Sequence, residues 1–113
     1  MLNKRYRISE KKDFENVYSL GKKIKGQYGM LIGLEDKDIA NCKFGVVVGK
    51  KIGKAHQRNK LKRWFRNIVQ RLLNEGFFKD NSLKVTYIAF KKPEDFKSFE
   101  QELLEQFRKL FEK

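Results

Sequence analysis

The chain has 113 residues and a formal net charge of +13. This length fits one compact domain, residues 1–113, that folds without a metal or disulfides, and the ten phenylalanines exclude a disordered basic tail. The single cysteine, Cys42, cannot form an internal disulfide, and we expect it to be a small buried hydrophobe.

The first predicted element is a short helix over residues 9–20. Phe14, Val17 and Tyr18 lie at i, i+3 and i+4, which places them on one face. Ser9 is the expected N-cap of this helix.

Strand segments are predicted after this helix. The sequence YGMLIGL at Tyr28–Leu34 is an apolar run typical of a strand, and a further short strand is expected near Lys22–Gln27. The acidic segment Glu35–Asp38 suits a loop. The sequence FGVVVG at Phe44–Gly49 sets three valines between glycines, which indicates a strand buried on both faces or nearly so.

A long helix is predicted from Ala55 or His56 to about Glu75, where Gly76 would stop it. Its apolar residues form one stripe at helical spacing: Leu61, Phe65, Ile68 and Leu72, widened by Val69 and Leu73.

The C-terminal third is predicted to contain one strand and one helix. The strand is Leu83–Phe90, which is rich in β-branched and aromatic residues, and Pro93 ends it. Ser98 and Gln101 form a capping-box pattern ahead of an amphipathic helix. The order of elements predicts an α+β fold, an α/β sandwich around one small central sheet.

The distribution of charge bears most directly on function. Residues 39–74 contain ten Lys or Arg and no Asp or Glu, although acids are present elsewhere in the chain. A face that only solvates a helix normally mixes both signs, so this one predicts binding to a polyanion, usually the phosphates of a nucleic acid. On a helical wheel the polar arc holds Arg58, Asn59, Lys60, Lys62, Arg63, Arg66, Asn67 and Arg71.

The run KKIGKAHQRNKLKRWFR at Lys50–Arg66 resembles the central motif of the bacterial ribonuclease P protein component. The family spacing Arg-Asn-x-x-Lys-Arg-x-x-Arg is met, and so is the preceding Lys-Lys-x-Gly-x-Ala. The matching residues are Arg58, Asn59, Lys62, Arg63 and Arg66 in the first pattern, Lys50, Lys51, Gly53 and Ala55 in the second, and Arg5, Arg7, Asp13, Phe14 and Tyr18 in the N-terminal pattern. The resemblance extends over nearly the whole chain in length and element order.

This resemblance implies a fold and a function. The fold would be similar to the ribosomal protein S5 domain 2-like fold, with an N-terminal helix, a basic crossover helix and a C-terminal helix around the sheet. The chain would be the small subunit of the ribonucleoprotein that removes 5′ leaders from precursor tRNA, with hydrolysis by the RNA subunit and its Mg²⁺. Its partners would be the catalytic RNA and precursor tRNA, with no obligate protein partner.

The resemblance also assigns site residues. RNA binding is implied for Lys50, Lys51, Arg58, Asn59, Lys62, Arg63 and Arg66, with no catalytic residue and no metal ligand in the protein. Three departures from the family are Gly49 where Ser is usual, His56 where Val is usual, and Ile32 where an aromatic residue is common.

The resemblance also implies a cleft for the single-stranded leader between the first helix and the sheet. Single strands bind without sequence preference when bases stack on aromatic side chains inside a cationic groove. Phe14 and Tyr18 lie one helical turn apart and Tyr28 opens a strand, so these three rings are the candidates. The same helical spacing is also typical of core residues.

The residues alone leave other functions open. A basic ribosomal or RNA-assembly protein with no role in a nuclease would carry the same charge. Double-stranded DNA binding is disfavoured because no second helix is spaced for a helix-turn-helix, and a membrane-surface helix would need the apolar stripe that the strands require. A metal-dependent nuclease is disfavoured because His56 is the only histidine and the basic region lacks carboxylates.

The N-terminal sequence and the lengths of the apolar runs indicate where in the cell the protein is expected. The N-terminal MLNKRYRISEKK lacks the apolar core of a secretory signal. No apolar run approaches the ~18 residues of a membrane span. We therefore expect a soluble cytoplasmic protein without membrane contact.

Overall fold

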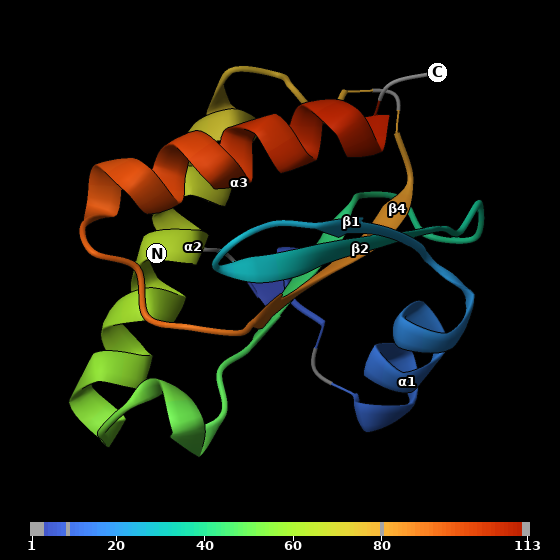
Figure 1. Cartoon of the computed structure of the whole chain (residues 1–113). Helices are drawn as coiled ribbons and strands as arrows, with labels where there is room; N and C mark the ends of the chain where they lie inside the picture. The colour runs from blue at the N-terminus through green and yellow to red at the C-terminus, as the bar shows by residue number, and fades with distance from the viewer. Residues whose placement is uncertain (1–3, 9, 80, 112–113) are drawn as a thin grey trace.

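A computed structural model describes residues 4–8, 10–79 and 81–111. One sheet is flanked by helices on both faces (Figure 1). The elements are the 3₁₀ helix η1 (Lys4–Tyr6), α1 (Lys11–Leu20), β1 (Lys22–Lys25), β2 (Gly29–Glu35), β3 (Lys43–Val47), the 3₁₀ helix η2 (Lys50–Ile52), α2 (Ala55–Asn74), β4 (Leu83–Ala89) and α3 (Phe96–Phe111). The predicted α+β architecture is confirmed, including the short strand after α1. The predicted N-cap Ser9 lies outside the described residues.

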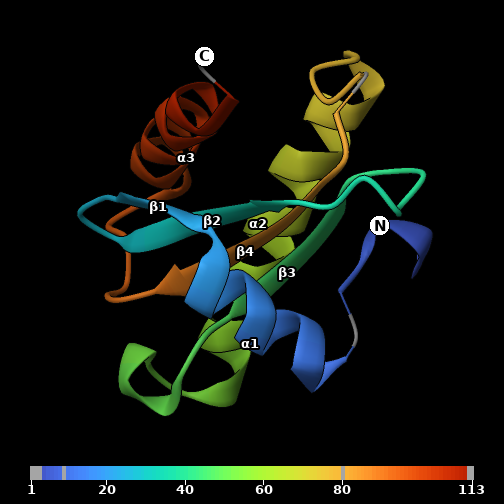
Figure 2. The same cartoon turned by 90° about the vertical axis from the view of Figure 1, so that its right-hand side faces the viewer.

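The sheet is mixed, with the strand order β1-β2-β4-β3 (Figure 2). β2 pairs antiparallel with both β1 and β4, whereas β3 and β4 are parallel and joined by α2. The N-terminal segment continues the β3 edge through a parallel bridge between Arg7 and Phe44, and the Ile8 N–H donates to the Phe44 carbonyl at 2.8 Å. This segment therefore brings basic N-terminal residues beside β3.

Two hydrophobic clusters lie on opposite faces of the sheet. α2 and α3 cover one face, where the rings of Phe65 and Tyr87 stack with centroids 5.6 Å apart. α1 covers part of the other face, with Val17 packed against Met30 and Ile32 (Figure 1). The predicted stripe of α2 is confirmed, since Leu61, Phe65, Ile68, Val69 and Leu72 are all buried.

The prediction that the three valines form a strand buried on both faces is wrong. β3 ends at Val47 and lies at the edge of the sheet, and Val47 is 43% exposed. A valine run does not distinguish a central strand from an edge strand whose outer face is covered only in part. The consequence is an exposed apolar position beside α1.

The predicted capping box at Ser98 and Gln101 is also wrong. α3 begins at Phe96, and the Ser98 N–H donates to Asp95 Oδ1 at 2.8 Å. Asp95 therefore caps the helix one turn earlier than expected, because its carboxylate satisfies a free N–H of the first turn.

Two smaller expectations hold. Cys42 is buried, its Sγ donates to the Asn81 carbonyl at 3.4 Å, and burial raises the pKa of its thiol. Gly76, with φ of +77°, follows α2 as the expected stop. No helix in the described part of the chain is both long and apolar enough to cross a membrane.

Candidate nucleic-acid interface

The side of α2 opposite its apolar stripe carries a shared hollow of about 400 Å³. We call its lining the basic face, which consists of Asn59, Lys62, Arg63, Arg66 and Asn67. Each residue is three or four positions from another along the helix, so helical geometry places the side chains together. The predicted gathering of these five residues is therefore confirmed.

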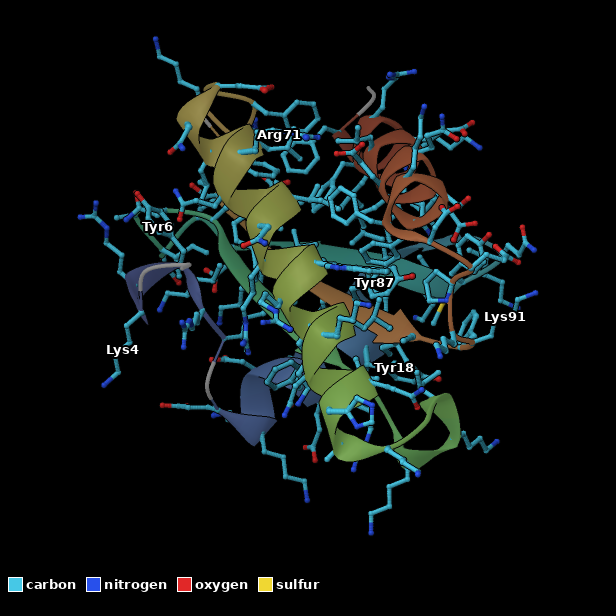
Figure 3. The ribbon with its side chains drawn as sticks, turned by 90° about the vertical axis from the view of Figure 1, so that its left-hand side faces the viewer. Lys4, Tyr6, Tyr18, Arg71, Tyr87 and Lys91 are labelled. Carbon is cyan, nitrogen blue, oxygen red and sulfur yellow. The ribbon has the colours of Figure 1, made fainter. Side chains whose placement is uncertain are left out.

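Among the residues that the structure describes, one salt bridge involves α2. Arg71 pairs with Glu100 of α3 at 2.6 Å (Figure 3). The described salt bridges otherwise involve residues outside α2, and none includes Lys62, Arg63 or Arg66. The charge of the basic face is therefore available to an external anion.

Arg66 is half-buried on this face. Burial, followed by the nearby charge of Arg7, lowers the pKa of the Arg66 guanidinium from its ordinary value. Both effects disfavour the charged form in the isolated protein, although a guanidinium keeps its proton at neutral pH. A phosphate bound here would offset the repulsion between the two guanidinium groups.

The remaining predicted RNA-binding residues lie nearby but outside the hollow. Lys50 and Lys51 are exposed in η2, between β3 and α2. Arg58 is half-buried in the first turns of α2, and its Nε has no hydrogen-bond partner in the structure. Lys60 does not line the hollow either. Its Nζ lies over the Trp64 ring, 5.3 Å from the ring centroid.

A second surface lies between α1 and the sheet. A hollow of about 600 Å³ there is lined by Lys11, Phe14, Glu15, Tyr18, Ser19, Val47, Thr86 and Ile88. We call it the aromatic groove. Phe14 approaches β3 so closely that a Cβ added at Gly45 would lie 2.4 Å from its Cε1, so the glycine permits this packing. Tyr18 is 53% exposed.

The structure does not place Tyr28 in this groove. Tyr28 is buried immediately before β2, where its hydroxyl donates to Glu94 and its N–H donates to Glu102 Oε1 at 2.9 Å. Bonding to Glu94, the largest effect, together with burial raises the pKa of the Tyr28 hydroxyl. Its N–H ties the connection between β1 and β2 to Glu102 of α3, and Tyr28 does not line the groove.

None of the three groove residues that the sheet contributes was predicted from the sequence: Val47, Thr86 and Ile88. Thr86 and Ile88 alternate with Val85 and Tyr87, which belong to the core on the opposite face of β4. This alternation was available as a signal, because a period of two separates the faces of a strand. The sequence does not show which face of β4 packs against α1, so the alternation alone could not assign Thr86 and Ile88 to the groove.

The basic face and the aromatic groove adjoin each other at β3. A small hollow of about 70 Å³ has Arg7 and Arg66 in its lining together with Phe14 and Gly45. One extended ligand can therefore contact aromatic rings and cations on this side of the molecule.

Mg²⁺ is implied for the assembled ribonucleoprotein. Within residues 4–8, 10–79 and 81–111, no three His, Cys, Asp or Glu side chains gather in a way that could hold a metal ion.

Comparison with known proteins identifies the family. The family model described as Ribonuclease P matches residues 2–113. The chain belongs to the ribonuclease P family. The resemblance read from the basic motif is therefore confirmed.

Relatives in this family are similar in sequence and fold. The ribonuclease P protein component of Fusobacterium nucleatum is 36% identical over 63 residues, which cover 56% of each chain. That of Syntrophomonas wolfei is 37% identical over 70 residues, which cover 62% of this chain and 58% of the relative. The chain thus spans less than two thirds of the length of these curated relatives.

Solved structures match over a longer stretch. The RNase P protein of Thermotoga maritima is 29% identical with a TM-score of 0.77, covering 91% of this chain and 96% of that one. The Staphylococcus aureus RNase P protein is 25% identical with a TM-score of 0.81, covering 94% and 97%.

The three departures from the family motif are accommodated locally. A Cβ added at Gly49 would meet no atom within 4 Å, so the site has room for a side chain. His56 is exposed in the first turn of α2. Ile32 is fully buried beneath α1 and is absent from the lining of the aromatic groove.

Proposed function

We propose that this chain is the protein subunit of a ribonuclease P that matures the 5′ end of tRNA in the cytoplasm. The basic face, with Arg58 and the exposed Lys50 and Lys51, binds the catalytic RNA subunit. The aromatic groove holds the single-stranded 5′ leader of precursor tRNA. The RNA subunit and its Mg²⁺ perform hydrolysis, and the protein supplies binding and orientation.

The observation that carries this proposal is the junction of the two surfaces at β3. A chain that only stabilised folded RNA would need the basic face alone, as a ribosomal or assembly protein does. Here an apolar groove with Phe14 and the half-exposed Tyr18 ring lies next to Arg66. Rings and cations in one groove suit a single strand, because bases stack while phosphates pair with cations.

The test replaces Tyr18 with Ala in the reconstituted holoenzyme. Loss of one base–ring stack is expected to weaken binding of precursor tRNA by about 1–3 kcal/mol, roughly 5- to 150-fold. Binding of mature tRNA, which lacks the leader, should not change. Dissociation constants for both tRNAs are the measurement.

Leu20→Ala is the matched control, because Leu20 is exposed on the same helix but does not line the groove. Equal weakening for both tRNAs, or no weakening, would contradict the groove assignment. Cleavage of precursor tRNA by the protein without RNA would contradict the assignment of hydrolysis to the RNA subunit.

A further inference from the structure

The floor of the aromatic groove belongs to a row of residues that crosses the whole sheet. Directly opposed residues of neighbouring strands share a face. From the β3 edge to the β1 edge, the row on the α1 side is Val47, Ile88, Met30 and Lys25. The groove therefore points towards a lysine on the outermost strand.

The next row leads to a second lysine. Lys23 of β1 is opposite Ile32, which packs under α1, so Lys23 also lies on the α1 side. Its Nζ lies 5.2 Å from the centroid of the Tyr18 ring. Tyr18 thus forms part of the groove wall and also contacts a cation of β1.

Lys23 and Lys25 are both exposed, and no carboxylate of the described residues forms a salt bridge with either. Lys22 differs, since its Nζ donates to the Lys109 carbonyl of α3 at 3.4 Å. Lysines on an edge strand also block pairing with another sheet. That role explains their charge, but it requires neither the contact with Tyr18 nor the alignment with the groove floor.

We propose that Lys23 and Lys25 form a phosphate-binding exit for single-stranded RNA that leaves the aromatic groove across β1. This inference rests on the proposed function, because it extends the strand held by Phe14 and Tyr18. Cations then lie at both ends of the apolar floor, with Lys50 and Lys51 shortly after Val47 at one end and the β1 lysines at the other. Only a strand long enough to pass Tyr18 reaches the exit.

The experiment measures the affinity of the full chain for fluorescent single-stranded RNA oligonucleotides of about 4 to about 16 nucleotides, the range of common single-strand sites. The test variant is Lys23→Glu with Lys25→Glu. Its affinity should match the unmodified chain for the shortest RNA and fall for the longest. Loss of two contacts with a salt slope of about 0.7 each corresponds to roughly 25-fold at about 0.1 M salt.

Lys79→Glu with Lys97→Glu is the matched control, because it makes the same charge change at exposed lysines outside the groove. Tyr18→Ala reports on the groove itself. A loss confined to long RNA in the β1 variant supports the exit.

An equal loss at every length, matching the control, would overturn the exit as a net-charge effect. No loss in the β1 variant, while Tyr18→Ala weakens binding, would overturn the exit and leave the proposed function intact. No loss in either variant would overturn both.

Discussion

Arg63 and Arg71 lie on the same helix and differ in their neighbours. Arg71 pairs with Glu100, whereas Arg63 lines the basic face with Lys62 and Arg66. The three cations of the basic face form no salt bridge with a described carboxylate, so they repel one another in the free protein. A bound phosphate would therefore gain more binding free energy from Arg63 than from Arg71, whose charge is already balanced by Glu100.

We predict opposite effects for these two arginines. Arg63→Gln should weaken RNA binding and lower the slope of log affinity against log salt by about 0.7–0.9, the loss of one phosphate contact. Arg71→Gln should leave that slope unchanged and lower the free energy of unfolding by at most about 1 kcal/mol, because its ion pair is partly exposed. Salt titrations and urea unfolding of both variants are the measurements; a reduced slope for Arg71→Gln would contradict the distinction.

Single residues also show where sequence reasoning failed. Phe14 and Tyr18 lie on the same side of α1, as helical periodicity predicts from local sequence. Tyr28 was misplaced because its partners, Glu94 and Glu102, lie more than sixty residues away in sequence. Val47 was misread because its exposure depends on where the edge of the sheet lies. Residue type indicates which side chains bury well, and only the topology decides what covers them.

At the scale of elements, α1 is held on the sheet by an ion cluster as well as by Val17. Lys84 Nζ of β4 lies 2.8 Å from Asp13 Oδ1 of α1 and 3.2 Å from Asp36 Oδ2 after β2. α1 has only ten residues and no side-chain cap at Glu10, so it gains little stability on its own. The cluster fixes Asp13, and therefore the neighbouring Phe14, over the sheet.

The pKa values of Asp36 and Lys84 in this cluster are both shifted, so the cluster makes the stability of the fold depend on pH. The pKa of Asp36 lies below its ordinary 3.8, first because the Asp38 N–H donates to its carboxylate and then because of Lys84. The pKa of Lys84 lies above its ordinary 10.5, chiefly through its hydrogen bond to Asp13. The carboxylate contribution is present above the ordinary pKa and is lost as pH falls through the folded value. The lysine contribution is present below 10.5 and is lost as pH rises through its raised value.

We predict that Lys84→Gln flattens the pH profile of the free energy of unfolding at both ends. The unmodified chain should lose stability below about pH 4 and above about pH 10.5. The variant should be less stable between these limits and should lose less at either end. Urea unfolding across pH is the measurement, with Lys79→Gln as an exposed control; identical profiles for both variants would contradict a role for the cluster.

Most elements could be predicted from the sequence because their signals are local. The stripe of α2 and the stop at Gly76 are examples. The start of α3 was set one turn late, because Asp95 and Ser98 both suit an N-cap and local propensity does not choose between them. The Lys84 cluster was not predicted, since its members come from three separate segments and only the sheet register brings them together.

In the whole molecule, the two candidate surfaces belong to helices that pack on opposite faces of the sheet, the basic face to α2 and the aromatic groove to α1. α2 and α3 bury their apolar faces together on one side, and α1 leaves part of the other side open as the aromatic groove. The sequence predicted the basic face, because it resides in one helix. The junction of that face with the groove at Arg7, Phe14 and Arg66 depends on how three segments meet at β3.

We propose that the basic face binds RNA through its phosphates. The most direct measurement is the salt dependence of affinity for the catalytic RNA, comparing the chain with a variant carrying Lys62→Gln, Arg63→Gln and Arg66→Gln. A variant carrying Lys79→Gln, Lys97→Gln and Arg108→Gln removes the same charge from exposed residues elsewhere. We expect the slope of log affinity against log salt to fall by roughly 2–3 in the first variant only. Equal slopes in the two variants would contradict it.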